Sequence, residues 1–224
     1  MPRVARIIAP QYPHHITQRG NNRTDVFFDD DDKATYLSAL KNYSEQWSVK
    51  LWAYCLMTNH VHLLAVPEDG VSLSRCIGRT NLLYTQHINR KYNHSGRLWQ
   101  NRFFSTIIET ESYLWAVARY IEQNPVKAKL IKRPHDYHWS SCRANISGMS
   151  DGLVTGEGWL DEKERGAYEI FLMQEDPATD QKIRVSTSTG RPLGSESFTA
   201  SLEIKLSRKL LPGKAGRPKK PRII

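Results

Sequence analysis

The chain has few cysteines, no long apolar run and no acidic residue in residues 205–224. Cys55, Cys76 and Cys142 are an odd number without CxxC spacing, which argues against a disulfide framework or a zinc ribbon and favours the cytosol. No stretch approaches the roughly 18 apolar residues of a membrane-spanning helix, and residues 1–10 have too short an apolar run for a signal peptide. We therefore expect a soluble, cytoplasmic protein with no membrane partner.

Charge is distributed unevenly along the 224 residues. The formal net charge is +9, and residues 71–149 carry 12 basic and 4 acidic side chains, residues 150–204 carry 5 and 11, and residues 205–224 carry 8 and none. Clustered lysines and arginines gain affinity for a polyanion by releasing its condensed counterions. The two basic zones therefore predict a nucleic-acid partner, contacted once by the central part of the chain and again by its tail.

A pair of histidines in an apolar, strand-like run is the most informative motif. In an extended strand His60 and His62 point to one face, where they can hold one metal ion, and Val61 points into the core. For an isolated pair of this kind, packed and hydrogen-bonded histidines are the commoner outcome. The motif therefore needs support from elsewhere in the chain.

A helical pattern that begins at residue 111 supplies this support. Tyr120 and Asn124 lie four residues apart, away from the apolar stripe of the helix, so they can reach one site together. Pro125 makes Asn124 a helix end, because the residue before proline avoids the helical region. Tyr113 lies on nearly the same face as Tyr120, so spacing alone leaves two candidate nucleophiles.

Four stretches in this order resemble the single-tyrosine HUH transposases, specifically the REP-associated tyrosine transposase branch. They are HITQRGN at 15–21, MTNHVHLL at 57–64, GRLWQNRF at 96–103 and RYIEQNPVKA at 119–128, and they extend over roughly the first 143 residues. The resemblance implies that Tyr120 is the nucleophile and that His60, His62 and Asn124 hold Mg²⁺ or Mn²⁺. It also implies that the protein nicks and rejoins single-stranded or hairpin DNA through a 5′-phosphotyrosine intermediate.

Basic and polar residues are expected to contact this DNA. Some follow the strand expected at 14–19, and others precede the strand expected at 103–109, where Trp99 is available for base stacking. Two more lie in the 119–128 motif that contains Tyr120. The segment 216–220 resembles an AT-hook core, although a nonspecific basic arm fits it equally well. The other histidines, His14 and His15 among them, are interpreted as surface or core residues. The expected DNA-contacting residues are Arg19, Asn21, Arg23, Arg97, Trp99, Gln100, Arg102, Arg119, Lys127, Arg217, Lys219 and Lys220.

The order of apolar runs predicts an α+β protein with a ferredoxin-like split βαβ plan, one antiparallel sheet and helices on one face. We expect residues 1–143 to form the catalytic domain and residues 144–204 to form a linker and a mostly helical extension, with helices at 160–171 and 195–211. Residues 205–224 are expected to be a basic tail, disordered when free.

Two other functions are compatible with the same residues. One is a noncatalytic DNA-binding regulator on the same fold, and the other is a metal-dependent phosphodiesterase that uses water and forms no covalent adduct. The sequence also leaves open whether the protein acts as a monomer or as a homodimer.

Overall fold

The structure, a computed structural model, describes residues 6–154 and 159–210. At its centre is an antiparallel sheet of four strands in the order β2-β3-β1-β4. Helix α1 joins β1 to β2 and helix α2 joins β3 to β4, which is the β-α-β-β-α-β order of a ferredoxin-like fold. The predicted α+β class and antiparallel sheet are confirmed. The bounds are β1 His14–Arg19, α1 Asp30–Gln46, β2 Val49–Leu56, β3 His60–Pro67, α2 Ser72–Lys91 and β4 Phe104–Ile107.

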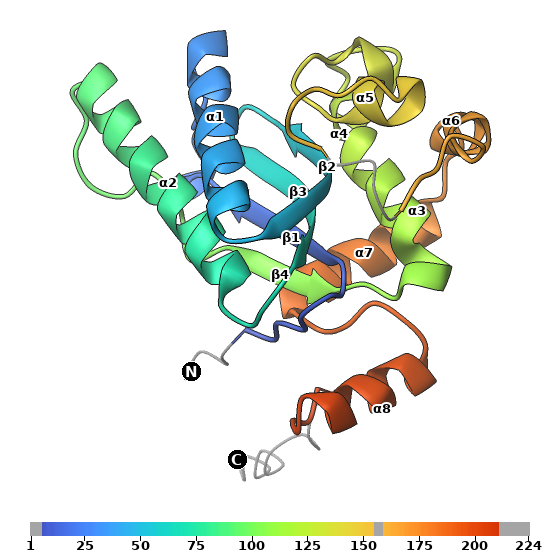
Figure 1. Cartoon of the computed structure of the whole chain (residues 1–224). Coiled ribbons are helices and arrows are strands. Elements are labelled where there is room, and N and C mark those ends of the chain that lie inside the picture. The colour runs from blue at the N-terminus through green and yellow to red at the C-terminus, as the bar shows by residue number, and fades with distance from the viewer. Residues whose placement is uncertain (1–5, 155–158, 211–224) are drawn as a thin grey trace, which may run out of the picture.

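Helices cover both faces of the sheet (Figure 1). Side chains alternate along β3, so Val61 and Leu63 pack in one core with α1 and α2, whereas Leu64 and Val66 belong to a second core. On this second face, α3 (Thr110–Glu122) contacts β2 and β3, and α7 (Pro177–Thr189) contacts β1 and β4. The expectation of helices on one face is therefore wrong, because the central strands are apolar on both faces and both need to be covered.

The segment expected to be a linker and extension contributes to the second core. Leu172 of α6 (Arg165–Leu172) and Ile183 of α7 are buried there, and Leu193 joins them. The backbone of Leu193 exchanges hydrogen bonds with Ile107 and Glu109 beside β4. Helix α7 has no counterpart in the sequence-based expectation. The remaining elements are α4 (Asn124–Lys127), α5 (Cys142–Ser147), α8 (Glu196–Lys205) and 3-10 turns at Asn21–Arg23 and Pro134–Asp136.

None of the helices in the described part of the chain is long and apolar enough to cross a membrane. The sequence predicts strands at 14–19 and 60–67 and a helix at 72–93, and the bounds of β1, β3 and α2 agree with these ranges to within two residues. Helices α6 and α8 are shorter than the runs predicted at 160–171 and 195–211.

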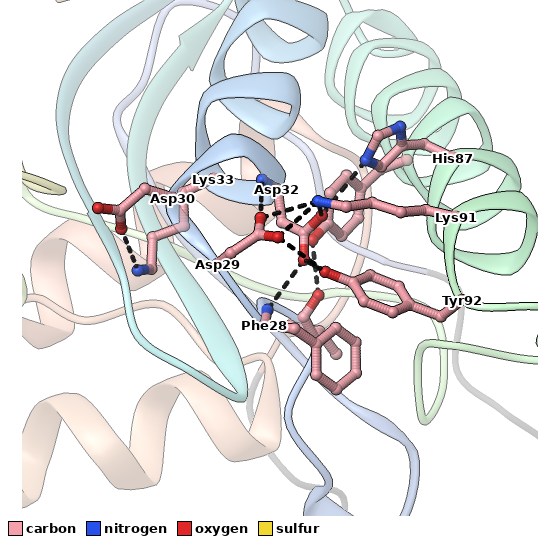
Figure 2. A network of polar contacts seen from close by, with 10 residues as sticks. Phe28, Asp29, Asp30, Asp32, Lys33, His87, Lys91 and Tyr92 are labelled. Atoms are coloured by element: carbon pink, nitrogen blue, oxygen red, sulfur yellow. Dashed lines mark hydrogen bonds and ion pairs between the residues drawn. The ribbon is translucent and has the colours of Figure 1, made fainter.

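A polar cluster joins the start of α1 to the end of α2, as Figure 2 shows. The Lys91 ammonium lies 2.7 Å from an Asp29 carboxylate oxygen and 2.9 Å from one of Asp32, whose side chain is buried. The Tyr92 hydroxyl donates to both carboxylates, and the backbone amide of Phe28 donates to Asp32. The cluster thus fixes the two helices that cover the first face of the sheet.

Candidate active site

A cavity of about 420 Å³ opens on the second face of the sheet. His60 and His62 reach it from β3, Tyr120 from α3, and Arg184 and Thr187 from α7. The register explains why the histidines share the cavity, because Thr17 of β1 pairs with His62 and Arg19 pairs with His60 on the same face. Val61, between them, is fully buried in the opposite core, as predicted.

A chain of hydrogen bonds sets the tautomer of His62. The Thr187 hydroxyl donates to the carbonyl of Ile183, so its oxygen accepts from His15 Nδ1 at 2.8 Å. His15 Nε2 is then the acceptor for His62 Nδ1 at 3.0 Å. This assignment leaves the lone pair of His62 on Nε2, which is the form that can bind a metal ion.

His60 has a similar arrangement through a different partner. Its Nδ1 lies 2.6 Å from the Asn59 side-chain oxygen, and the Asn59 amide nitrogen donates to the carbonyl of Arg23, so the oxygen is the acceptor toward His60. Both histidines therefore present Nε2 as the available nitrogen. The two ring centres are 4.9 Å apart.

All three imidazoles are neutral near pH 7. Burial, followed by the nearby positive charge of Arg19, lowers the pKa of His60 to about 4. Burial lowers the pKa of His15 to about 3, and burial and the neighbouring His60, His15 and Lys127 hold the pKa of His62 well below its ordinary value. A metal ion would therefore not compete with protons for these nitrogens at neutral pH.

Tyr120 lies directly against the histidines. Its ring centre is 5.7 Å from those of both His15 and His62, each in an edge-on arrangement. Burial raises the pKa of Tyr120, while a hydrogen bond from Arg184 and the charge of that guanidinium oppose the rise. By contrast, Tyr113 packs against the second core and does not line the cavity. Of the two candidate nucleophiles, the structure brings Tyr120 to the histidines.

The cavity attracts anions. Arg19, Arg23 and Arg184 contribute side chains to its wall, and within the described residues no carboxylate lines it. Fixed positive charge around a partly enclosed space stabilises a phosphate group and charge that develops on its oxygens.

Most of the predicted DNA-contacting residues that the structure describes gather at the end of β1. Backbone hydrogen bonds from Asn21 to Leu98 and from Gln100 to Arg19 hold the turn after β1 beside the segment before β4. The polar side chains of these two segments point to solvent. The exposed residues are Arg19, Asn21, Arg23, Arg97, Gln100 and Arg102.

Two other predicted contacts are buried in the protein. Trp99 is 8% exposed and packs 6.0 Å from the rings of both Tyr36 and Tyr84, so it is a core residue and not a surface for base stacking. Arg119 is 2% exposed, with its guanidinium over the Phe171 ring and 3.8 Å from Asp176. Neither side chain is available to DNA in this structure.

Lys127 lies close to the cavity but is already paired. Its ammonium forms an ion pair with Asp180 of α7 and lies 5.1 Å from the centre of the Tyr120 ring. Arg217, Lys219 and Lys220 lie outside the residues that the structure describes. Their predicted role stays a prediction.

The structure does not place Asn124 on the cavity wall. Its amide nitrogen donates to the carbonyls of Tyr120 at 2.7 Å and Ile121 at 3.3 Å, so the side chain folds back onto the end of α3. To serve as a ligand, Asn124 would have to turn away from these carbonyls. Its role as third ligand stays a prediction.

Sequence reasoning missed His15, Thr187 and Arg184. For His15 the signal was available, because the two-residue period of β1 places it on the face of Thr17, opposite His62. For α7 the sequence signals lie only at the two ends of the helix. The Asp176 side chain accepts from the Thr179 amide, Pro177 opens the helix, and Gly190 ends it with a positive φ of 71°.

The donor set fits a divalent ion. Two neutral imidazoles on one ion, each with its ring centre about 3 Å from the metal, cannot have centres more than about 6 Å apart, and the 4.9 Å separation satisfies this limit. Within the described residues no cluster of three or more His, Cys, Asp or Glu could hold a metal. Any ion here would therefore need an amide, DNA phosphate oxygens or water to complete its coordination.

A ferredoxin-like sheet with a tyrosine against a histidine pair in an arginine-lined cavity is suited to phosphodiester chemistry. Residues 9–124 match the family described as Transposase IS200 like, and the chain belongs to this family of enzymes, which cleave and transfer DNA strands. The resemblance stated from the four motifs is thereby confirmed.

Known proteins with similar sequence or fold agree with this family. A Haemophilus influenzae protein with the provisional name REP-associated tyrosine transposase is 27% identical over 122 residues, which are 50% of this chain and 69% of that protein. A solved REP-associated tyrosine transposase bound to a REP hairpin has a TM-score of 0.57 at 18% identity, over 70% of this chain and 93% of that one. At this identity the structural likeness shows the fold alone.

Proposed function

We propose that the protein is a metal-dependent, single-tyrosine transposase that nicks and rejoins single-stranded or hairpin DNA. The observation that carries the proposal is the contact of the Tyr120 ring with His15 and His62 beside His60, in a cavity walled by arginines. Hairpin DNA is proposed because the similar solved transposase is bound to a REP hairpin.

His60 and His62 would hold Mg²⁺ or Mn²⁺ through Nε2, with Asn124 as the proposed third ligand. The ion would supply polarisation of the scissile phosphate. Residues of the chain itself bind and position the DNA. Arg19, Arg23 and Arg184 bind the phosphate oxygens and orient the strand.

Tyr120 acts as the nucleophile in this proposal. Its Oη forms a bond to phosphorus and loses its proton, while the bond to the 3′ oxygen breaks and this oxygen takes up a proton to become a free 3′-hydroxyl. Arg184, which donates to Tyr120, favours the deprotonated oxygen. The 5′-phosphotyrosine keeps the energy of the original linkage, so another 3′-hydroxyl can attack it and rejoin the strands without a nucleotide cofactor.

The test is covalent capture of DNA. The full chain is incubated with Mn²⁺ and a pool of random-sequence DNA hairpins labelled at the 3′ end, and the adduct is resolved on a denaturing gel. The wild type should form the adduct. Tyr120→Phe should form none while retaining DNA binding, because only the nucleophilic oxygen is removed.

Tyr113→Phe is the matched control and should form the adduct at the wild-type level. Cleavage without an adduct would instead indicate a phosphodiesterase that uses water. Binding without cleavage would indicate a noncatalytic regulator. An adduct lost in Tyr113→Phe and kept in Tyr120→Phe would reverse the assignment of the nucleophile.

A further inference from the structure

Phe104 is an exposed aromatic side chain at the rim of the cavity. It is 46% exposed, although its neighbours Phe103 and Ser105 are buried. Strand pairing places Phe104 opposite Thr17, which stands opposite His62 on the other side. The three residues form one row across the sheet, so the backbones of Phe104 and His62 are roughly 10 Å apart.

A second hollow continues from the cavity beyond Phe104. It has a volume of about 310 Å³ and is lined by Arg6, Arg102 and the 188–190 end of α7, among others. Phe104 and Ser188 line both spaces. A chain that passes through the Tyr120 cavity can therefore cross the Phe104 ring and enter the second hollow.

Two arginines make this hollow positive. The Arg6 guanidinium lies 3.5 Å from the centre of the Phe103 ring and donates to the Phe103 carbonyl, so it is held in place. Burial and the nearby charge of Arg102 lower the pKa of Arg6 to about 10. Within the described part of the chain, neither arginine is within salt-bridge distance of a carboxylate, so an incoming anion would relieve their repulsion.

We propose that Phe104 and this hollow form a nucleotide subsite for single-stranded DNA. One base stacks on the Phe104 ring, and a neighbouring phosphate lies between Arg6 and Arg102. An aromatic face beside paired arginines matches a base linked to a phosphate, and a base can reach the ring only when it is outside a duplex. The proposal rests on the proposed function only in taking the cavity as the path of the DNA strand.

The first experiment measures binding of full-length protein to a fluorescent oligothymidylate of about 12 nucleotides, within the site sizes typical of single-strand binding. Chelator is present, so that no cleavage occurs. Phe104→Ala should weaken binding roughly 5- to 150-fold, the range for loss of one stacked base. Phe104→Trp should bind at least as tightly as the wild type, because the ring face is preserved.

Phe28→Ala is the matched control. Phe28 is 48% exposed but lies beside Tyr92, in the cluster of Figure 2. This variant should bind like the wild type. Equal affinity of wild type and Phe104→Ala, with both proteins unfolding at the same temperature, would overturn the subsite.

An abasic strand of the same length separates stacking from other effects. Wild type and Phe104→Ala should bind it equally, because it offers no base. A similar loss for Phe104→Ala on the abasic strand would show that the ring does not recognise a base, and the proposal would fail.

The phosphate contact has its own measurement. Arg102→Gln should reduce the slope of log affinity against log salt by about 0.7, the value for one charge on a single strand. An unchanged slope would remove the phosphate from the subsite. These binding assays in chelator do not depend on cleavage, so absence of the covalent adduct from the wild type would contradict the proposed function without affecting the Phe104 result.

Discussion

At the scale of the residue, His15 is the side chain whose importance the structure reveals. Through its Nε2 it accepts from His62, and through its Nδ1 it donates to Thr187. Groups that orient a metal-binding histidine in this way typically change metal affinity 10- to 100-fold when they are removed, as an order of magnitude. His15 is therefore a positioning residue for the proposed metal site.

His15→Phe should weaken Mn²⁺ binding by roughly 10- to 100-fold in calorimetric titration without DNA, because His62 loses the acceptor that fixes its tautomer. Thr187→Val should have a smaller effect in the same direction. Thr187→Ser, which keeps the hydroxyl, should bind Mn²⁺ like the wild type. Unchanged affinity in a stably folded His15→Phe variant would contradict this role.

How far the candidate site could be predicted depends on the kind of signal each residue leaves. His60 and His62 follow from strand alternation, and the family motif favours Tyr120 over Tyr113. Trp99 was mistaken for a surface residue because an aromatic among arginines has the same local sequence whether it stacks on DNA or fills the core. Only the tertiary packing distinguishes it from Phe104.

At the scale of the element, the cluster between α1 and α2 makes a pH-dependent contribution to stability. Hydrogen bonds from Lys91, the Asp32 amide and Tyr92 lower the pKa of Asp29 to about 2. Burial of Asp32 acts to raise its pKa, but hydrogen bonds from Lys91, Phe28, Tyr92 and His87 lower it overall. The pKa of Lys91 is raised by the same two carboxylates.

Lys91→Met should lower the urea midpoint of unfolding at neutral pH. A carboxylate with a lowered pKa stabilises the fold above its unfolded pKa of about 4. The difference between variant and wild type should therefore shrink as the pH falls from about 4 toward 2, the pKa of Asp29. It should also shrink in strong alkali, as Lys91 loses its proton.

The pair of Lys33 and Asp30, whose carboxylate is exposed, gives the comparison. Lys33→Met should change the midpoint little at any pH, because the Asp30 side chain is 78% exposed and solvent screens the pair. A Lys91→Met difference that persists at pH 2 would show that packing of the lysine stem, and not charge, links the helices.

The helices and strands that the sequence predicts best are those whose apolar residues recur at a regular spacing. The strands and α1 to α3 repeat buried side chains, so their existence and order were evident from sequence. Helix α7 has only Ile183 as a buried apolar side chain, its other buried residues are Asp180 and Thr187, and Val185 is exposed. Such a helix forms because its ends are capped and its partners are elsewhere in the fold, which an apolar pattern does not reveal.

At the scale of the whole molecule, the acidic part of the chain contributes an arginine to the candidate site. Residues 150–204 carry 11 acidic and 5 basic side chains, yet Arg184 lines the cavity, and Asp180 pairs with Lys127 beside it. Net charge by segment therefore predicts a nucleic-acid partner but not which segments build the site. The candidate site is built from residues on both sides of residue 143.

The basic tail is best tested by a deletion that begins after Leu210, where the described residues end. Lys205 ends α8, and Leu210 packs with Ala9 and Leu202, so removing residues 205–210 would damage a core. Deleting residues 211–224 removes five basic side chains, Lys214, Arg217, Lys219, Lys220 and Arg222. The slope of log affinity for duplex DNA against log salt concentration should then shrink by at most about 4.5, at roughly 0.9 for each phosphate contact.

Adduct formation on single-stranded DNA at low salt should persist in this deletion variant, because Tyr120, His60 and His62 lie upstream. Replacing the same five residues with glutamine should reproduce the change in slope. An unchanged slope in both variants would show that the tail is not a DNA-binding arm, and loss of the adduct at saturating DNA would show that it belongs to the active structure.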